Sequence, residues 1–473
     1  MKLYLDWNVL SSIKNGNLKE LETIIRQPEK FVIVYSTAHI SDISSSYSEN
    51  NNNLDNIQSD LEFISEITDD LCIFNNGKDI VIQQNDPFHL FENEIESRNL
   101  LDGFSFDKVF DTLNDNGNNT KLIEPLKELL KSFPIDNIFK DAFENPQSAD
   151  MMNAIFPGLK DNPTLEGFFN SMGKVLENIN DKEGYKDLKK PFKYLNINQG
   201  KLTNPNNNPF DTIKDTYKKL DIESPLEKEY MDEKHAPKWF NDLCSAYINL
   251  DMHGFHSDDV KVTEKEKKTF KNTTQDSFHA AFASTCDIYI TSDKKNYQKT
   301  RAIYNEKSIL THILKPDEFI QFYHENLEKI DFITSWNKLR EVMQSGNFYD
   351  ISDKNNPDDY YQVHFSRFYF FGYFNRIYIF NSDTDKNSLS LMFGKELPTN
   401  CLGVFYREIK EMVKIIVDYL GTDINGKGYF ELSEIDETNN WCGRIWDFGE
   451  FQYRLVQYKR YFQFYYDFST EVL

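Results

Sequence analysis

The chain begins with MKLYLDWN (residues 1–8), a short apolar run that ends at Asp6, with Asn8 two residues further on. Parallel strands that are buried on both faces have continuous apolar sequences, so this stretch predicts a buried strand of a parallel sheet. Asp6 is then at the carboxyl end of the strand, the edge at which open α/β sheets bind ligands. The same arrangement returns in IYITSD (residues 288–293), which ends at Asp293. Two strands that each end in an aspartate predict one acidic site built from distant parts of the chain.

The composition narrows the classes of function. The chain has 473 residues, enough for two or three domains, and a formal net charge of −23. Such a chain is not expected to coat nucleic acid through its overall field, although a bound divalent metal and a local basic patch can invert the potential at one site. The five cysteines are scattered and form no C-x-x-C pair, which argues against a disulfide framework or a zinc site. With no apolar segment of transmembrane length and no signal peptide, we expect a soluble, cytoplasmic protein without membrane attachment.

The order of the sequence patterns predicts an α/β fold. Strand and helix patterns alternate at the start of the chain, helical spacing dominates from about residue 54 to 265, and the α/β pattern resumes from 273 to 315. A turn-rich stretch at 354–359 is followed by a rise in Phe and Tyr, which favours strands. We therefore predict a parallel-sheet domain in two parts (1–50 and 269–350), a large helical insertion between them (51–268), and a C-terminal aromatic-rich α+β domain (351–473).

Four acidic motifs occur in a fixed order along the chain. They are LDWN at 5–8, STAHISD at 36–42, DSFHAA at 276–281 and TSD at 291–293. This order resembles the PIN-domain ribonucleases, which combine a strand ending in D-x-N, a serine followed by an acidic residue in a helix, an aspartate heading a small-residue helix, and a strand ending in T-x-D. The chain departs from the family pattern in having Asp42 rather than the more frequent Glu, and in the long gap before Asp276.

The resemblance implies a PIN-like metal-dependent ribonuclease, and the chemistry supports the same residues. Hydrolysis of a phosphodiester needs an activated water and neutralisation of charge at the phosphate. Clustered carboxylates can hold one or two Mg²⁺ or Mn²⁺ ions that supply both. The candidate catalytic and metal-binding residues are Asp6, Asp42, Asp276 and Asp293.

Further residues are candidates for supporting roles. Asn8 and Ser292 are candidates to orient the ligands as a second shell. His279 lies three residues after Asp276 on the same helical face, and we expect it either to hydrogen-bond a carboxylate, with Asp276 as the favoured partner, or to touch substrate. A basic cluster follows Asp293 and is either a contact for substrate phosphates or a solvated helix face. The cluster consists of Lys294, Lys295, Lys299 and Arg301.

Two functions follow from these observations. The first is a metal-dependent endoribonuclease that cleaves RNA, and the resemblance further implies a toxin or antiviral defence nuclease controlled by a protein partner. The preference for RNA over DNA rests on the resemblance alone. The second is a non-catalytic PIN-like scaffold that binds a protein partner. The four aspartates favour the enzyme, whereas the net acidity and the shorter Asp42 side chain favour the scaffold.

Overall fold

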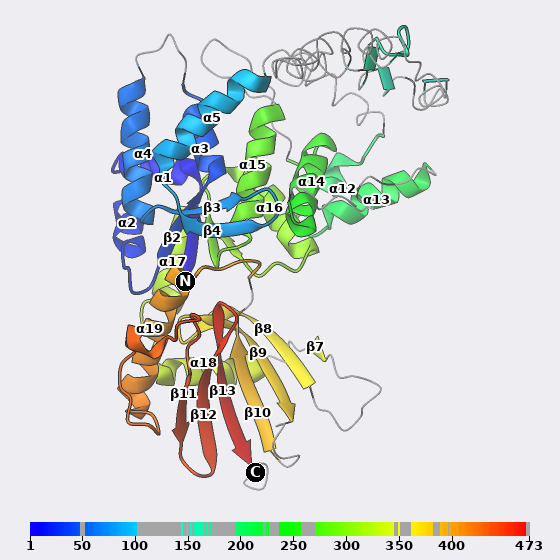
Figure 1. The fold of residues 1–473 in the computed structure, drawn as a ribbon. Coiled ribbons are helices and arrows are strands. Elements are labelled where there is room, and N and C mark those ends of the chain that lie inside the picture. Colours follow the sequence, from blue (N-terminus) through cyan, green and yellow to red (C-terminus); the bar gives the residue numbers. More distant parts are fainter. Residues whose placement is uncertain are drawn as a thin grey trace, which may run out of the picture.

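Two β-sheets organise the chain, and each has its own helices and hydrophobic core (Figure 1). The computed structural model describes residues 1–47, 53–101, 195–220, 236–256, 270–344, 349–350, 361–381, 388–395 and 397–469, with isolated positions between 143 and 171 and at 224 and 226. Among the helices in these ranges, none is both long and apolar enough to cross a membrane.

The first sheet contains six strands in the order β4-β3-β2-β1-β5-β6. These strands are β1 (Lys2–Leu5), β2 (Val32–Ser36), β3 (Leu71–Asn75), β4 (Ile80–Gln84), β5 (Ile288–Ile290) and β6 (His312–Leu314). All neighbouring strands are parallel except β3 and β4, which are antiparallel. Strand β1 is central, because Leu3 lies opposite Ile33 on one side and Ile288 on the other. The predicted α/β class is confirmed, and the first strand is buried and parallel to its neighbours as predicted.

Helices cover both faces of the first sheet. Because side chains alternate along a strand, Leu3 and Leu5 contribute to the core on one face and Tyr4 to the core on the other. The first face packs against α1 (Trp7–Lys14), α2 (Lys19–Ile25), α4 (Leu54–Thr68) and α17 (Pro316–Asn326). The second face packs against α3 (Thr37–Ser44), α13 (Pro209–Lys219), α14 (Lys238–Met252), α15 (Phe270–Ala283) and α16 (Lys294–Glu306).

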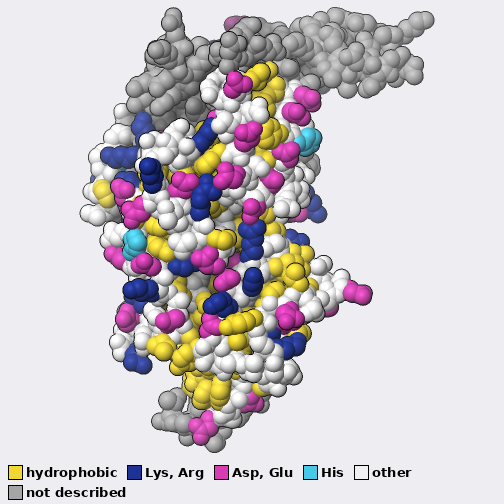
Figure 2. Space-filling view, turned by 90° about the vertical axis from the view of Figure 1, so that its left-hand side faces the viewer, with side chains coloured by type: hydrophobic (Ala, Val, Ile, Leu, Met, Phe, Trp, Pro, Cys, Tyr) yellow, Lys and Arg dark blue, Asp and Glu magenta, His cyan; other side chains and the backbone are white. Residues whose placement is uncertain are grey.

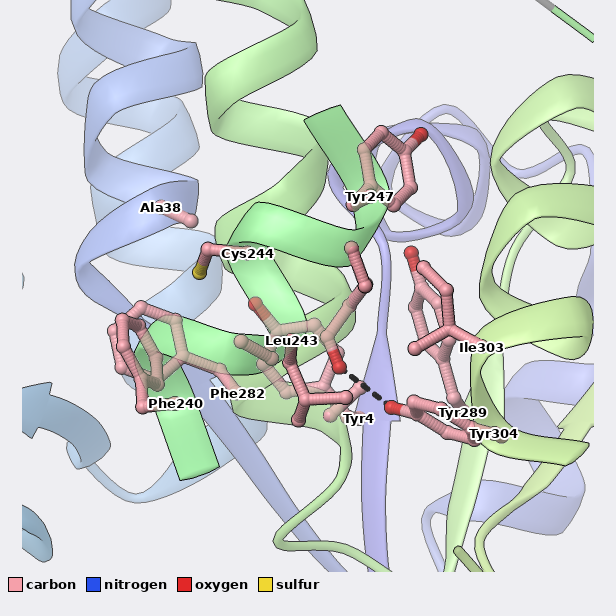
Figure 3. Packing of buried hydrophobic residues seen from close by; sticks show 14 of the residues in the cluster. Tyr4, Ala38, Phe240, Leu243, Cys244, Tyr247, Phe282, Tyr289, Ile303 and Tyr304 are labelled. Atoms are coloured by element: carbon pink, nitrogen blue, oxygen red, sulfur yellow. Dashed lines mark hydrogen bonds between the residues drawn. The ribbon is translucent and has the colours of Figure 1, made fainter. Parts of the chain in front are cut away.

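The segment predicted as a helical insertion differs from that prediction in two ways. First, residues 71–75 and 80–84 are not helical; they form β3 and β4 and extend the first sheet beyond β2. Second, α14 is part of the sheet's own core, since its Phe240 and Leu243 pack among buried residues of α15 and β5 (Figure 3). Helices α5 (Pro87–Leu101), α12 (Gln199–Leu202) and α13 fit the helical pattern.

The second sheet is antiparallel and has seven strands in the order β11-β12-β13-β10-β9-β8-β7. Its strands are β7 (Tyr349–Asp350), β8 (Tyr361–Phe370), β9 (Phe374–Asn381), β10 (Ser388–Gly394), β11 (Arg444–Asp447), β12 (Phe451–Tyr458) and β13 (Tyr461–Ser469). Helices α18 (Phe332–Gln344) and α19 (Leu402–Leu420) pack against it, around buried aromatic residues such as Phe393 and Phe464. Helix α18 precedes the boundary predicted at residue 351, yet Phe332 and Leu339 belong to this second core.

A buried ionic network joins the two sheets. The Lys395 ammonium, just after β10, lies 2.9 Å from the carboxylate of Asp287 before β5 and 3.0 Å from that of Glu408 in α19. Lys2 of β1 donates its side chain to the Thr399 carbonyl at 2.6 Å. The amino ends of β1 and β5, opposite the ends near Asp6, are therefore fixed to the C-terminal part of the chain.

Candidate functional site

Asp6 lies where β1 ends and α1 begins, at the carboxyl edge of the first sheet. Its backbone N–H continues the pairing with β5 by donating to the Ile290 carbonyl at 2.9 Å. Its side chain is only 6% exposed. One oxygen, Oδ2, accepts hydrogen bonds from Asn8 at 2.9 Å and from the Thr291 hydroxyl at 2.7 Å. Burial raises the pKa of Asp6, and the nearby negative charges of Asp42 and Asp293 add to that rise, while His279 opposes it.

Asp42 and His279 meet Asp6 at this edge. His279, on α15, is completely buried and its Nε2 lies 2.9 Å from the Asp42 carboxylate on α3. Ligand atoms of Asp6, Asp42 and His279 all lie within 4.8 Å of one another. We call these three residues the acidic cluster. The hydrogen-bond partner of His279 is Asp42 and not the expected Asp276, because one helical turn places His279 deeper in the core.

Asp276 and Asp293 lie around this cluster without being part of its compact group. Asp276, one turn before His279 on α15, helps to raise the pKa of that histidine. Asp293 caps α16, since its Oδ1 accepts from the backbone N–H groups of Lys295 at 2.7 Å and Asn296 at 2.8 Å. The structure thus places all four predicted aspartates in one electrostatic neighbourhood, with Asp6 and Asp42 closest together.

Asn8 and Ser292, the two residues expected to orient the ligands, make different contacts. Asn8 donates to Asp6 and accepts from the backbone N–H of Ser292 at 3.3 Å, so it links the ends of β1 and β5. Ser292 is exposed and makes this contact through its backbone. Thr291, rather than Ser292, contacts Asp6 through its side chain. The buried Thr291 hydroxyl donates to Asp6 and accepts from the Asp293 N–H at 3.1 Å. The T-x-D spacing could have identified this residue.

A chain of buried hydrogen bonds fixes His279 on the side of the ring opposite Asp42. Its Nδ1 lies 2.7 Å from the Tyr4 hydroxyl, which lies 2.6 Å from the Ser36 hydroxyl. The backbone N–H of Ser36 donates to His39 Nδ1 at 3.0 Å, so Nε2 of His39 carries the proton and donates to the Leu5 carbonyl at 2.7 Å. Burial lowers the pKa of His39 to about 3, so it is neutral. Tyr4 and His39 were not among the predicted site residues, although His39 stands at the third position of α3 after the Ser36 cap.

His279 carries a positive charge at neutral pH. Burial disfavours that charge, but Asp42, through its charge and its hydrogen bond, then Asp6 and Asp276, outweigh burial and raise the pKa to about 9. The imidazolium therefore donates one N–H to Asp42 and the other to Tyr4. Both ring nitrogens are engaged, so His279 orients Asp42 and offers no lone pair to a ligand.

This raised pKa predicts a pH-dependent stability. Because the folded pKa of about 9 exceeds the ordinary value of 6.5, the charge of His279 contributes fully below pH 6.5 and its contribution is lost as the pH rises through 9. The expected contribution is roughly 3 kcal/mol, at 1.36 kcal/mol per pKa unit. We expect the difference in unfolding free energy between wild type and His279→Gln, measured by urea unfolding in EDTA, to shrink by that amount from pH 6 to pH 9.5. The exposed His89, whose side chain contacts Asn93, supplies the control: His89→Gln should leave the pH profile almost unchanged. A wild-type-to-His279→Gln difference that is constant across this range would show that the imidazole is neutral.

The residues of the basic cluster after Asp293 differ in their exposure to solvent. Lys299 is not available to substrate: its side chain is fully buried, 2.9 Å from the buried carboxylate of Asp251 on α14 and 4.7 Å from the ring centre of Tyr247. The predicted phosphate contact is wrong for this residue, because residue 299 lies on the face of α16 that packs against α14. Lys294 is exposed at the start of α16, and Lys295 beside it is half-buried. Arg301 is exposed one turn after Tyr297, which it contacts.

The surface around the first sheet has no uniform charge on the side shown in Figure 2. On the face formed by α2, α4 and α19, Lys and Arg side chains alternate with Asp and Glu. This face therefore has no broad basic patch.

Comparisons with protein-family models, with curated proteins and with solved structures found no match for this chain.

Proposed function

We propose that the chain is a metal-dependent ribonuclease with a PIN-like α/β domain, whose acidic cluster and flanking aspartates hydrolyse phosphodiester bonds in RNA. The observation that carries this proposal is the approach of the Asp6 and Asp42 carboxylates, whose oxygens lie within 4.8 Å of each other at the carboxyl edge of the first sheet. Open α/β sheets place their ligands at this edge. A regulatory protein partner belongs to the same proposal and rests on the family resemblance.

The donor set fits a divalent cation such as Mg²⁺ or Mn²⁺, which prefer carboxylate oxygens. Asp6 Oδ2 is satisfied by Asn8 and Thr291, whereas Oδ1 accepts no hydrogen bond from any residue in the described ranges. The Asp42 side chain is 29% exposed, so solvent reaches the acidic cluster on the side where Asp42 lies. Burial, and then the negative charges of Asp42 and Asp293, raise the pKa of Asp6, and a divalent cation bound there would offset both effects.

The roles of the residues follow from their contacts. Asp6, Asp42, Asp276 and Asp293 would hold the ion. When bound, it would neutralise charge on the phosphate and lower the pKa of a water molecule, which makes that water a nucleophile. Asn8 and Thr291 fix the orientation of Asp6, and His279 fixes that of Asp42. Lys294 and Lys295, next to Asp293, would hold the phosphate backbone of the substrate.

The test of this function uses the full chain with a labelled single-stranded RNA and a DNA of the same sequence. We expect cleavage of the RNA in Mn²⁺ or Mg²⁺, little cleavage of the DNA, and none of either in EDTA. Intact RNA after prolonged incubation with both metals would contradict the proposal.

Charge removal at the start of α16 tests the role of the lysines. Replacing Lys294 and Lys295 together by Gln should weaken RNA binding and lower the slope of log affinity against log salt by about 1.4, at roughly 0.7 per phosphate contact for single strands. The cleavage rate at saturating RNA should change less than the affinity, because the carboxylates remain. Lys329→Gln, which removes an exposed charge after α17, is the control and should leave the salt slope near that of wild type. Equal slopes for wild type and the double variant would show that the two lysines form only a solvated helix end.

A specific observation supports the non-catalytic scaffold as the second candidate. The imidazolium of His279 already compensates the charge of Asp42, so the acidic cluster is partly neutralised by the protein itself. A scaffold would therefore need no metal. Calorimetric titration with Mn²⁺ separates the two candidates: heat of binding that disappears in Asp6→Asn supports the enzyme, and an absence of binding supports the scaffold.

A further inference from the structure

Helix α18 covers the hydrophobic face of the second sheet over part of its length. On this face, the Trp336 ring of α18 lies 5.6 Å from the buried ring of Phe393 in β10. Strands β10, β12 and β13 continue past α18, away from the first sheet (Figure 1). We call this part of the second sheet its distal end. Phe451 at the start of β12 lies opposite Phe468 in β13, so both rings lie on the same face of the distal end.

Aromatic rings follow one another along the distal end. Phe448 stacks on Phe451 at 5.2 Å between ring centroids, and Phe451 lies 5.8 Å from Tyr453. Tyr453 stacks on Tyr466 at 5.0 Å, and Tyr466 stacks on Phe468 at 5.2 Å. These distances are typical of aromatic rings in contact. The five residues therefore form one continuous surface, which we call the aromatic patch.

The aromatic patch is fixed to the core on one side and exposed on the other. The Tyr453 ring lies 5.6 Å from the buried Phe464 ring and is nearly parallel to it, at 4°. Phe448 is 48% exposed. Hydrophobic side chains gather over the second sheet in the lower part of Figure 2. Rings that are already held in place lose little conformational freedom on binding, and exposed apolar patches mark interaction sites.

Two carboxylates border the aromatic patch. Asp447 and Glu450 flank Phe448 between β11 and β12, and all three residues are exposed. The Asp447 carboxylate accepts from the backbone N–H of Gly449 at 2.9 Å. Neither Asp447 nor Glu450 forms an ion pair with a residue in the described part of the chain. Such carboxylates repel phosphates and attract Lys and Arg, so this border disfavours RNA and favours a basic partner.

We propose that the aromatic patch binds a basic amphipathic segment of a partner protein. The apolar side chains of the segment pack on the rings from Phe448 to Phe468, and its Lys or Arg side chains pair with Asp447 and Glu450. Aromatic residues are enriched in the buried centres of protein interfaces, and charges at the border select the partner. A second copy of this chain fits the patch less well, because each copy has a net charge of −23 and carries the same carboxylates.

The aromatic patch is separate from the acidic cluster. The C-terminal part of the chain is attached to the amino ends of β1 and β5 through Lys2 and Lys395, whereas the acidic cluster lies at the carboxyl edge of the first sheet. Binding at the patch requires neither metal nor RNA. This inference therefore stands independently of the proposed nuclease activity.

Fluorescence anisotropy with the full chain in EDTA tests this surface. The probe is a labelled helical peptide of leucine and lysine whose leucines form one face. The comparison peptides are one of the same composition with its leucines dispersed, and a leucine–glutamate peptide with the same apolar face. We expect the probe to bind roughly tenfold more tightly than either comparison peptide, since only the probe presents both an apolar face and positive charge.

Substitution of an exposed ring locates the binding site. Phe448→Ser should weaken binding of the probe roughly tenfold, as expected for an aromatic contact at the centre of an interface. Tyr458→Ser is the matched control, because its ring is 50% exposed at the opposite end of β12, and it should bind the probe as wild type does. Circular dichroism of Phe448→Ser should match wild type, since the Phe448 side chain is exposed.

Charge removal tests the border of the patch. Replacing Asp447 by Asn and Glu450 by Gln together should weaken binding of the probe and flatten its salt dependence. Replacing the exposed Glu92 and Glu96 of α5 by Gln removes the same charge elsewhere and should leave the affinity at the wild-type value.

The inference is overturned if the probe does not bind at micromolar concentration, or if Phe448→Ser binds it as tightly as wild type. A wild-type dimer in sedimentation that Phe448→Ser dissociates would overturn it by making a second copy the occupant. Binding of single-stranded RNA in EDTA that Phe448→Ser abolishes would overturn it by making the patch a surface for bases.

Discussion

Replacing Asp6 by asparagine is expected to lower metal-dependent RNA cleavage by roughly 10²–10⁴-fold, because metal ligation supplies several kcal/mol of transition-state stabilisation. The substitution removes the charge but hardly changes the volume. Asp6 is almost fully buried at the end of the central strand, and its Oδ2 accepts from both Asn8 and Thr291. An asparagine can still accept those two bonds through its amide oxygen, so the fold should survive while the metal affinity falls. The measurement is single-turnover cleavage at saturating RNA over a range of Mn²⁺ concentrations.

The matched control is Asp211→Asn, the same chemical change at an exposed position on α13. It should cleave at the wild-type rate. Cleavage by Asp6→Asn within a factor of two of wild type, with both proteins folded by circular dichroism, would make the acidic cluster a structural feature only.

The second large effect concerns the junction between the two sheets. Lys395→Met is expected to lower the free energy of unfolding by about 3–5 kcal/mol, the usual cost of leaving a buried charge without its partner. Burial disfavours the charge on Lys395, but Asp287 and Glu408 outweigh it and raise its pKa. Both carboxylates are buried, at 2.9 Å and 3.0 Å from the ammonium, so methionine would leave two negative charges facing each other.

A surface pair of the same type provides the comparison. Lys414 pairs with Asp418 at 2.6 Å, but its side chain is 55% exposed. Exposed pairs contribute about 0–1 kcal/mol, so Lys414→Met should change the unfolding free energy by less than that. Urea unfolding of both variants at pH 7 measures the difference. A loss below 1 kcal/mol for Lys395→Met would mean that the network reorganises or takes up water.

The parts of the fold that followed from sequence are those with strong local patterns. The apolar run before Asp6 and the matching run before Asp293 predict two strands, and the structure shows that these strands are adjacent. Short strands at the edge were missed, because Leu71–Phe74 and Ile80–Ile82 are apolar runs too brief to distinguish a strand from a helix by periodicity. Their assignment depends on pairing with β2, which is a long-range property.

The site shows the same division. The four aspartates have chain-order signatures, so they were identifiable as a set. The groups that hold them were not, because their roles depend on burial. His39 is neutral only because the core surrounds it, and Tyr4 reaches His279 only because β1 lies beside α15. Lys299 shows that burial can also remove a residue from a predicted site. Its charge suggested a surface role, but its position on the helix places it against Asp251 in the core.

The most direct test of the central claim is a crystal structure of the full chain soaked in Mn²⁺, with anomalous data collected to locate the ion. We expect an anomalous peak at coordination distance from both Asp6 and Asp42, with Asp276 or Asp293 facing it directly or through water. The Asp6→Asn crystal, soaked in the same way, should lose the peak. A wild-type crystal with no peak between Asp6 and Asp42, and with His279 still bonded to Asp42, would contradict the claim that this edge of the sheet is a metal-dependent nuclease site.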